Sequence, residues 1–523
     1  MSTLICNPGR DCINSLGIPV DSLTLESAVE RIIAMAEARD GRARLVSTLN
    51  VDFLVNSLGT AFSRPRHPEL LEVLRASDLV TADGFPIVWL SRLMGRPLPG
   101  RVCGSDMVPA IAARAARDGL SLFLLGGGEG AAAEAASTLQ QQNPGLRIAG
   151  TAAPMVRTAG PGLAAAAEDD EALLQIINES GADILLVGLG NPKQELWFNR
   201  NRSGLRTPVS IGVGGTFEFV TGRVSRAPKR WQQLNLEWLF RLSQDPGRLW
   251  KRYGKGLFKM ALLAAPVLTA RAAESLTALS RSASSEPIRW RHLWSSREDS
   301  ISLLSLPRRL EGDSLPRINH DRVTRTGGDG RHSLDCSQVR RVTLSCQQEM
   351  FHLAALLRQY PGKLQLMGMS AAMRRQLRGA RLLDLLEVGS NTKGALNSLS
   401  AGPQAGAPFR CRSYMLRDEA LFMISGRVNR DNLAAIGFTE CLLHSARDRR
   451  CIIDLRDVEL LESSGIAELM PLFQPRDGYA GDVLLSGTGY SVKQMLKMAE
   501  LDYDARFISD QALLAIINGG TQP

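Results

Sequence analysis

The 523-residue sequence has no cysteine pair spaced C-x-x-C, no long apolar run and no apolar leader. Its eight cysteines are scattered, which argues against a zinc site or a disulfide framework and favours a reducing compartment. Residues 1–11 lack the apolar core of a signal peptide, and no run reaches the ~18 apolar residues of a membrane span. We therefore expect a cytoplasmic protein.

The sequence does carry an excess of positive charge. Its net charge is +9 and its pI is near 9.3, which predicts an anionic partner but does not choose among nucleotide, nucleic acid and anionic lipid. An apolar content of 44% is ordinary for globular proteins. The length predicts about three domains.

Residues 182–220 contain the most informative pattern. An apolar run at 184–187 ends in a turn rich in glycine and proline, a helix-capable segment follows, and a second apolar run at 209–213 closes on two glycines. This order is typical of a parallel α/β sheet, which binds ligands at the carboxyl ends of its strands. An ordinary strand–helix loop has the same local signature. The polar residues of the first turn are Asn191, Lys193, Gln194 and Glu195.

Three further strand ends carry candidate site residues. Thr48 and Asn50 close an apolar run, although simple helix capping would give the same pattern. Asp83 follows the next run and precedes a glycine, a position that suits either a general base or a helix cap. Arg101 could hold a diphosphate through its guanidinium group.

The segment 120–131 is a buried strand that enters a glycine-rich turn with Gly126 and Gly128. It fits G-x-G-x-x-A, but a dinucleotide site also needs an acidic residue about 20 positions further on. Residues 147–150 contain none. A nucleotide-sugar diphosphate therefore fits this turn better than NAD, and a dinucleotide oxidoreductase is disfavoured.

Residues 222–268 combine basic and aromatic side chains. Ten lysines and arginines, among them Arg226 and Arg230, lie between 222 and 259, and a short apolar stretch follows at 256–268. This pattern suits nucleic acid or an anionic membrane surface, and the apolar stretch favours a helix lying in the membrane interface. A solvated basic helix is the alternative. We expect the membrane surface and no nucleic acid.

The second half of the chain contains an internal repeat. Residues 280–333 are rich in Ser, Arg and Pro and are interpreted as a linker. Residues 334–388 and 414–517 then share positions at a constant offset of 119, separated by a second linker at 389–413. Such an offset without gaps predicts two related modules. The matching pairs are Asp335/Asp454, Val339/Val458, Ser345/Ser464, Leu353/Leu472, Gly368/Gly487, Leu377/Leu496 and Leu382/Leu501.

The segments GLGNPKQE and GVGGTFEFVTGRVSRAPKRWQQLNLEWLFRL resemble the WecB/TagA/CpsF glycosyltransferases. The resemblance covers residues 14–256, and RVCGSDM matches the family's R-V-x-G-x-D-L. It implies inverting transfer of an N-acetylhexosamine-type sugar from a UDP-sugar to a polyprenyl-pyrophosphate-linked saccharide. That transfer belongs to bacterial surface or exopolysaccharide synthesis and needs no cofactor or metal. The transferase-like half contains no D-x-D motif and no His/Cys cluster.

The same resemblance implies roles for individual residues. Asp83 would be the catalytic base, and Thr48 and Asn50 would shape the acceptor pocket. The other implied binding residues are Arg101, Asp106, Gly126, Gly128, Asn191, Lys193, Gln194, Arg226 and Arg230. The basic segment 222–268 would face the membrane, which would place the enzyme peripherally on the inner face of the plasma membrane.

Residues 414–517 resemble the STAS domain of anti-sigma-factor antagonists. The family pattern D-S-S-G appears as Glu462-Ser463-Ser464-Gly465, and the second serine is phosphorylated in signalling members. Ser464, and next to it Ser463, is therefore a candidate for phosphorylation, with a kinase or another protein as partner. A plain helix N-cap is the alternative. Thr343-Leu-Ser345 replaces this motif in the first repeat, which looks degenerate.

The sequence thus predicts an α/β protein with a Rossmann-like parallel-sheet glycosyltransferase domain and two smaller STAS-like α/β domains, the first degenerate. A signalling scaffold with an inactive transferase half is the alternative from another functional class.

Overall fold

The structure is a computed structural model of the whole chain. In the first half it describes residues 10–59, 65–158, 166–224, 228, 231, 237–244 and 246–278. In the second half it describes residues 289–295, 300–305, 309–310, 330–336, 339, 341–344, 346–348, 350–351, 364–367, 369–383, 387–388, 409–415, 419–446, 450–473, 483–487, 490–498, 507–508 and 513.

The first half is organised around a six-stranded parallel sheet with the order β4-β3-β8-β7-β5-β6. The runs expected to be strands at 184–187 and 209–213 are the central strands β7 and β8, so the predicted parallel α/β fold is confirmed. The strands are β3 (Arg44–Leu49), β4 (Leu79–Ala82), β5 (Ser121–Gly126), β6 (Arg147–Ala152), β7 (Ile184–Gly188) and β8 (Val209–Gly212).

Helices cover both faces of this sheet, and a short antiparallel hairpin precedes it. The first helix begins at Leu25 because the Thr24 side chain accepts a hydrogen bond from the Ser27 backbone N–H in a capping box. The hairpin is β1 (Cys12–Ser15) and β2 (Ile18–Asp21), and the helices are α1 (Leu25–Glu37), α2 (Val51–Ser57), α3 (Pro68–Ala76), α4 (Phe85–Leu93), α5 (Gly104–Asp118), α6 (Ala131–Gln142), α7 (Ala166–Glu179), α8 (Lys193–Asn201) and α9 (Thr216–Val220).

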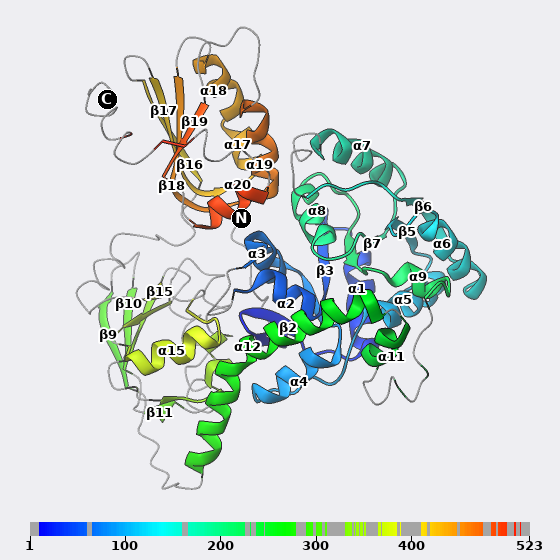
Figure 1. Cartoon of the computed structure of the whole chain (residues 1–523), viewed down its shortest axis with the longest axis horizontal. Coiled ribbons are helices and arrows are strands. Elements are labelled where there is room, and N and C mark those ends of the chain that lie inside the picture. Colours follow the sequence, from blue (N-terminus) through cyan, green and yellow to red (C-terminus); the bar gives the residue numbers. More distant parts are fainter. Residues whose placement is uncertain are drawn as a thin grey trace.

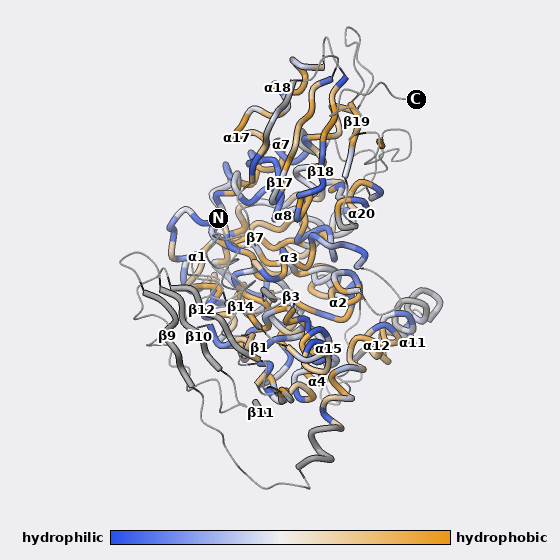
Figure 2. Tube along the Cα trace, turned by 90° about the vertical axis from the view of Figure 1, so that its left-hand side faces the viewer, coloured by the Kyte–Doolittle hydropathy of each residue, from blue (hydrophilic) through white to orange (hydrophobic). Residues whose placement is uncertain are grey.

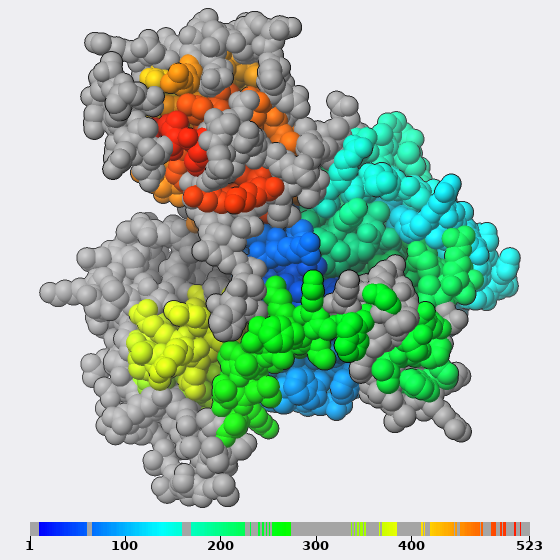
Figure 3. Space-filling model, in the orientation of Figure 1, coloured from blue at the N-terminus to red at the C-terminus, as the bar shows by residue number. Residues whose placement is uncertain are grey.

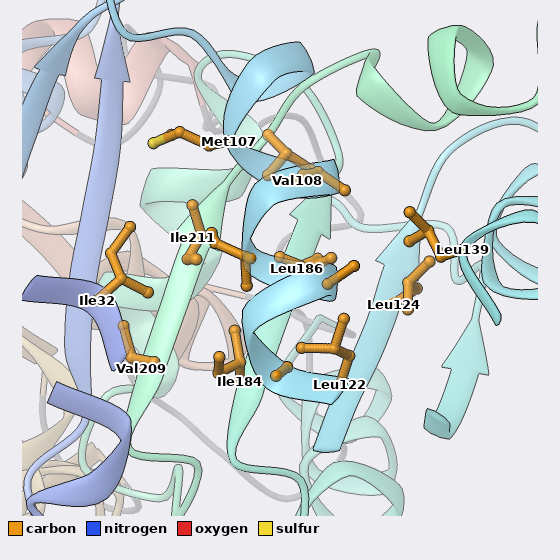
Figure 4. Packing of buried hydrophobic residues seen from close by; sticks show 14 of the residues in the cluster. Ile32, Met107, Val108, Leu122, Leu124, Leu139, Ile184, Leu186, Val209 and Ile211 are labelled. Carbon is orange, nitrogen blue, oxygen red and sulfur yellow. The ribbon is translucent and has the colours of Figure 1, made fainter. Parts of the chain in front are cut away.

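Alternate strand residues supply the two halves of the core, because side chains point to opposite faces along a strand. Leu122, Leu186 and Ile211 face α1, α5 and α6, as Figure 4 shows. Leu185 and Val187 face the other side, where they join the buried rings of α8. Both faces of the central strands are therefore apolar, which explains their continuous apolar sequence.

The helix α12 (Pro246–Ala278) extends the first unit beyond the expected boundary at residue 256, and α11 (Glu237–Gln244) precedes it. One face of α12 enters the core beside α2 and α4 through Met260, Leu263, Ala264 and Val267. Its other face lies on the surface, where α12 runs between α4 and the helix α15 of the second half (Figure 3).

The segment expected to be a linker at 280–333 contains strands. β9 (Arg289–Ser295) and β10 (Ser300–Ser305) join the sheet of the first repeat, whose order is β15-β14-β12-β10-β9. That repeat therefore begins near residue 289 rather than at 334. Its other elements are β11 (Arg309–Leu310), β12 (Gly330–Asp335), β13 (Arg341–Val342), β14 (Leu364–Met367), α15 (Ala371–Gly379) and β15 (Glu387–Val388).

The second repeat has the sheet β16-β17-β18-β19, with β16 antiparallel to β17 and the others parallel. The offset of 119 residues relates β14 to β19 and α15 to α20, residue for residue. β16 starts at Arg410, inside the expected second linker, of which residues 389–408 lie outside the described part. The elements are β16 (Arg410–Met415), β17 (Glu419–Val428), α17 (Arg430–Ala435), α18 (Phe438–Ala446), β18 (Arg450–Leu461), α19 (Ser463–Leu469), η2 (Met470–Phe473), β19 (Val483–Ser486) and α20 (Tyr490–Met498).

Both repeats contact the first unit, and they do so at different places. Figure 1 shows the second repeat beside α3 and α8, and α15 of the first repeat beside α12. In the view turned by 90°, β17, β18 and β19 lie at one end of the molecule, and β3 and β7 of the parallel sheet lie nearer its middle (Figure 2).

The position of β7 in the middle of the sheet gives a stability test. Leu186 is 0% exposed, so Leu186→Ala should lower the free energy of unfolding by about 2–5 kcal/mol through lost burial and a cavity. Leu257→Ala, at a position 63% exposed on α12, should change it by no more than about 0.5 kcal/mol. Urea unfolding of the two variants checks this, and equal losses would contradict the core assigned here.

Candidate active site

Five of the six parallel strands end at polar or glycine-rich segments on one edge of the sheet. Asn50 follows β3, Asp83 follows β4, Gly214 follows β8, Asn191 follows β7 and Gly128 follows β5. Because all these strands are parallel, their carboxyl ends meet at the same edge. The candidate residues of five separate sequence segments are thereby brought together.

Hydrogen bonds connect three of these strand ends. The Thr48 hydroxyl donates to the Gly212 carbonyl oxygen at 2.9 Å, which joins β3 to β8. The Gly214 backbone N–H donates to Gln194 Oε1 at 3.1 Å, which joins β8 to the start of α8. A Cβ at Gly212 would clash with the side chains of Gln194 and Glu195, so a larger residue there would displace them.

Asparagines occupy the next positions along this edge. Asn50 is the N-cap of α2, and its side chain accepts from the backbone N–H groups of Asp52 and Phe53 at 3.0 and 3.4 Å. The capping interpretation of Asn50 is therefore confirmed. Both capping bonds use its Oδ1 and neither uses its Nδ2. Asn191 Oδ1 accepts from Asn56 Nδ2 at 2.6 Å, whereas its buried Nδ2 has no protein partner within the described part of the chain.

A second cluster surrounds Asp83. The backbone N–H of Val102 donates to the Ala82 carbonyl at 2.9 Å, so the segment after α4 runs beside the end of β4. Arg101 Nη2 then lies 3.4 Å from Asp106 Oδ2, with both side chains partly exposed.

Cys103 lies in the same cluster but has an inert thiol. Its Sγ donates to Asp106 Oδ2 at 2.9 Å, and burial, followed by the charge of Asp83, raises the pKa of Cys103 to about 12. Asp83 therefore sits among charged groups at a half-buried strand end, where a carboxylate can receive a proton.

Sequence reasoning missed the role of Glu195. This carboxyl group is 0% exposed, and its Oε1 accepts from Gln194 Nε2 at 2.7 Å. Burial raises the pKa of Glu195 to about 8, so it is mostly protonated at neutral pH. A neutral acid beneath the site holds the amide of Gln194 in one orientation.

Glu218 changes the interpretation of the glycine-rich turn. Gly126 has φ +95°, a backbone conformation that favours glycine, and a Cβ there would meet the Gly188 backbone. The Gly128 N–H faces Glu218 Oε1 at 3.4 Å. A diphosphate placed on this turn would meet a carboxylate, whereas sugar or ribose hydroxyl groups could donate to it.

The remaining predicted site residues lie elsewhere or outside the described residues. Lys193 is the first residue of α8 and is exposed at the site edge. Arg226 and Arg230 fall outside the described part of the chain. Ser463 and Ser464 are the first two residues of α19, in the second repeat. Glu462, not a serine, is the N-cap residue of that helix, so the capping interpretation of the serines is wrong.

A carboxylate, a guanidinium group and amides at one edge of a parallel sheet are typical of group-transfer enzymes. Residues 13–274 match the model of the "Glycosyl transferase WecG/TagA/CpsF family". The chain belongs to this family and is a glycosyltransferase.

Two individual proteins illustrate what the chain is similar to. A Bacillus spizizenii protein, N-acetylglucosaminyldiphosphoundecaprenol N-acetyl-beta-D-mannosaminyltransferase, is 30% identical over 191 residues. The match covers 36% of this chain and 70% of that protein. The solved structure of the anti-sigma factor antagonist SpoIIAA in its unphosphorylated form matches 22% of this chain and 100% of that one, with 11% identity and a TM-score of 0.19.

The buried acid at Glu195 predicts a pH dependence of stability. A raised pKa means that the contribution is complete below about 4.5 and is lost as the pH rises through about 8. Wild type should therefore lose about 1 kcal/mol of unfolding free energy between pH 7 and pH 9. Glu195→Gln, which keeps the carbonyl acceptor, should not show this loss. Parallel denaturation curves at the two pH values check the difference, and identical pH profiles would contradict it.

Proposed function

We propose that the chain transfers an N-acetylhexosamine-type sugar from a UDP-sugar to a polyprenyl-pyrophosphate-linked saccharide. The observation that carries this proposal is the gathering of Asp83, Arg101, Asn191 and Gln194 at one edge of the parallel sheet. The printed name of the Bacillus spizizenii relative, which describes sugar transfer to a lipid-linked diphosphate saccharide, supports the substrate class.

The proposed chemistry is a single displacement with inversion. The acceptor hydroxyl oxygen attacks the anomeric carbon, and the bond from that carbon to the UDP oxygen breaks. UDP leaves with the bonding electrons, and the acceptor proton passes to the Asp83 carboxylate. No metal ion is required in this proposal, and transfer that persists in excess EDTA would support that part of it.

The site residues would bind different parts of the substrates. Arg101 and Lys193 are cationic groups at the site edge, and they would neutralise the diphosphate as it leaves. Gln194 and Asn191 would hold the sugar through their amides. Glu218 would accept hydrogen bonds from ribose or sugar hydroxyls beside the Gly126 turn.

The helix α12 supplies the proposed membrane contact. Its outer face exposes Trp250, Leu257 and Phe258, at 68%, 63% and 69%. Lys255 is exposed beside them, whereas the Lys259 amine donates inward to the Val55 carbonyl at 2.6 Å. Aromatic and basic side chains on one helix face suit an anionic membrane surface. None of the helices in the described ranges has the length and apolarity of a transmembrane span.

This membrane contact would place the enzyme on the inner face of the plasma membrane, in exopolysaccharide or other surface-polysaccharide synthesis. The two repeats would serve regulation or partner binding as STAS-like modules. The alternative function is a signalling scaffold with an inactive transferase half, and it is favoured by the fusion to these repeats. Incubation with a panel of UDP-sugars and lipid-pyrophosphate acceptors distinguishes the two.

The role of Asp83 gives the central activity test. Asp83→Asn should lower the transfer rate by about 10²–10⁴-fold, because the base that receives the acceptor proton is lost. UDP binding, measured by calorimetry, should survive. Asp118→Asn, an exposed change at the far end of α5, is the matched control and should transfer sugar like wild type. Near-normal turnover in Asp83→Asn would remove Asp83 from the mechanism.

The membrane proposal is best tested with point variants. A truncation after Val220 would delete the proposed membrane face, but it would remove Met260 and Leu263 from the core as well. Phe258→Ser should instead lower binding to anionic vesicles by about tenfold, since it removes one buried aromatic side chain from the bilayer. Met155→Ser, at a position 76% exposed outside α12, should leave binding unchanged. Flotation that is insensitive to both Phe258→Ser and high salt would count against the proposal.

A further inference from the structure

The start of α19 is in direct contact with the transferase unit. The Ser463 backbone N–H donates to Glu69 Oε2 at 2.8 Å, and its hydroxyl donates to Glu69 Oε1 at 3.2 Å. Asn199 Nδ2 donates to both Glu69 Oε1 and Glu462 Oε2, at 3.1 and 3.0 Å. We call these four residues the junction: Glu69 from α3, Asn199 from α8, and Glu462 and Ser463 from the second repeat.

Three of the four junction residues are closed to solvent, and Asn199 is partly buried. Glu69 and Ser463 are each 1% exposed, and Glu462 is 4% exposed. Ser464 is 3% exposed, and its hydroxyl oxygen faces the Arg430 backbone N–H inside the second repeat. The serine pair therefore meets the transferase rather than solvent, and neither a kinase nor a separate protein can reach it in this arrangement.

The first repeat uses the corresponding segment in the same way. The described helical residues 344, 346–348 and 350 lie 119 positions before residues of α19. The Asn14 backbone N–H donates to Gln348 Oε1 at 2.7 Å, and Gln348 Nε2 donates back to the Asn14 carbonyl at 3.1 Å. Gln348 is 0% exposed. Each repeat therefore contacts the transferase through this helical segment, and the contact is neutral in the first repeat and acidic in the second.

The two carboxyl groups of the junction differ in their partners. Arg427 of β17 pairs with Glu462, while Glu69 receives hydrogen bonds from neutral donors. The arginines at the end of α8 are engaged elsewhere, since Arg200 pairs with Asp170 and the C-cap residue Arg202 pairs with Asp78.

The remaining groups near Glu69 on α3 add no net charge to it. Burial lowers the pKa of His67 to about 4, which leaves its ring neutral, and Arg75 pairs with Glu72. Burial, and then the charge of Glu462, raises the pKa of Glu69 to about 7. The junction is therefore stable only while it holds few negative charges.

Both transferase elements at the junction also support the site. α8 begins with Lys193 and Gln194, and Asn199 lies on the same helix. α3 leads directly into β4, and Asp83 follows β4. Release of the second repeat would remove contacts from the two elements that position the base and the Gln194 amide.

We propose that the transferase half of the same chain is the partner of the α19 start, and that added negative charge at the junction releases the second repeat and slows transfer.

The test uses the full-length chain and hydrogen–deuterium exchange of the segments 462–469 and 68–76. Ser463→Asp places a carboxylate against Glu69 and should raise exchange in both segments. Ser413→Asp, at an exposed serine on β16, is the matched control and should leave both segments protected. The double variant Ser463→Asp with Glu69→Gln removes one charge and should restore protection, which a merely misfolded Ser463→Asp would not do.

A second measurement varies the pH. Because the pKa of Glu69 is raised, its contribution to docking is complete below about 4.5 and is lost as the pH rises through about 7. Docking should therefore weaken by about tenfold between pH 6 and pH 8 in wild type. In Glu69→Gln it should not change. Exchange rates are compared after correction for their intrinsic pH dependence.

Two results would overturn the proposal. The first is unchanged protection in Ser463→Asp, or protection that Glu69→Gln does not restore. The second is a transfer rate that is unchanged or raised in a variant whose second repeat is released. The transfer measurement rests on the proposed function, but the exchange measurement does not, so failure of one is distinguishable from failure of the other.

Discussion

Backbone hydrogen bonds between the parallel strands β3, β8 and β7 determine where the candidate site residues lie. These strands are covered on both faces, so their side chains fill the core and only their carboxyl ends can present polar groups. The turns that follow must bring three backbones together, and this explains Gly212, where a Cβ would clash with Gln194. The Thr48 and Gln194 hydrogen bonds then connect one turn to the next.

Burial of carboxyl groups recurs at two places with different consequences. Glu195 lies beneath the site with a raised pKa, and its neutral form orients a neighbouring amide. Glu69 lies at a contact between units, where its neutral form permits a second carboxylate, Glu462, to approach. In both cases the surroundings favour the protonated acid because solvent is excluded. One acid therefore supports the geometry of the site, and the other makes a contact between units dependent on charge.

The sequence was sufficient to predict the features that depend on the order of residues along a short stretch of chain. The apolar runs at 184–187 and 209–213 became β7 and β8, and the offset of 119 holds for β19 and α20. The strands β9 and β10 were missed because the surrounding segment is rich in Ser, Arg and Pro, and because β10 enters the sheet by pairing with β12, which lies further along the chain. Glu195 and Glu218 were missed for a related reason. Burial and proximity to a glycine turn are tertiary properties that no spacing encodes.

The contacts that the two repeats make with the transferase unit differ in charge. The first repeat presents Gln348, whose amide satisfies both backbone groups of Asn14 whatever the pH, so this contact has no charge to respond to. The second repeat presents a serine and a glutamate to a buried acid, and the free energy of that contact changes with each added charge. The proposed charge dependence therefore concerns the second copy, whose contact places the Ser463 hydroxyl beside the buried Glu69. In the proposed arrangement, the same α/β module serves once as a fixed part of the enzyme and once as a part that responds to charge.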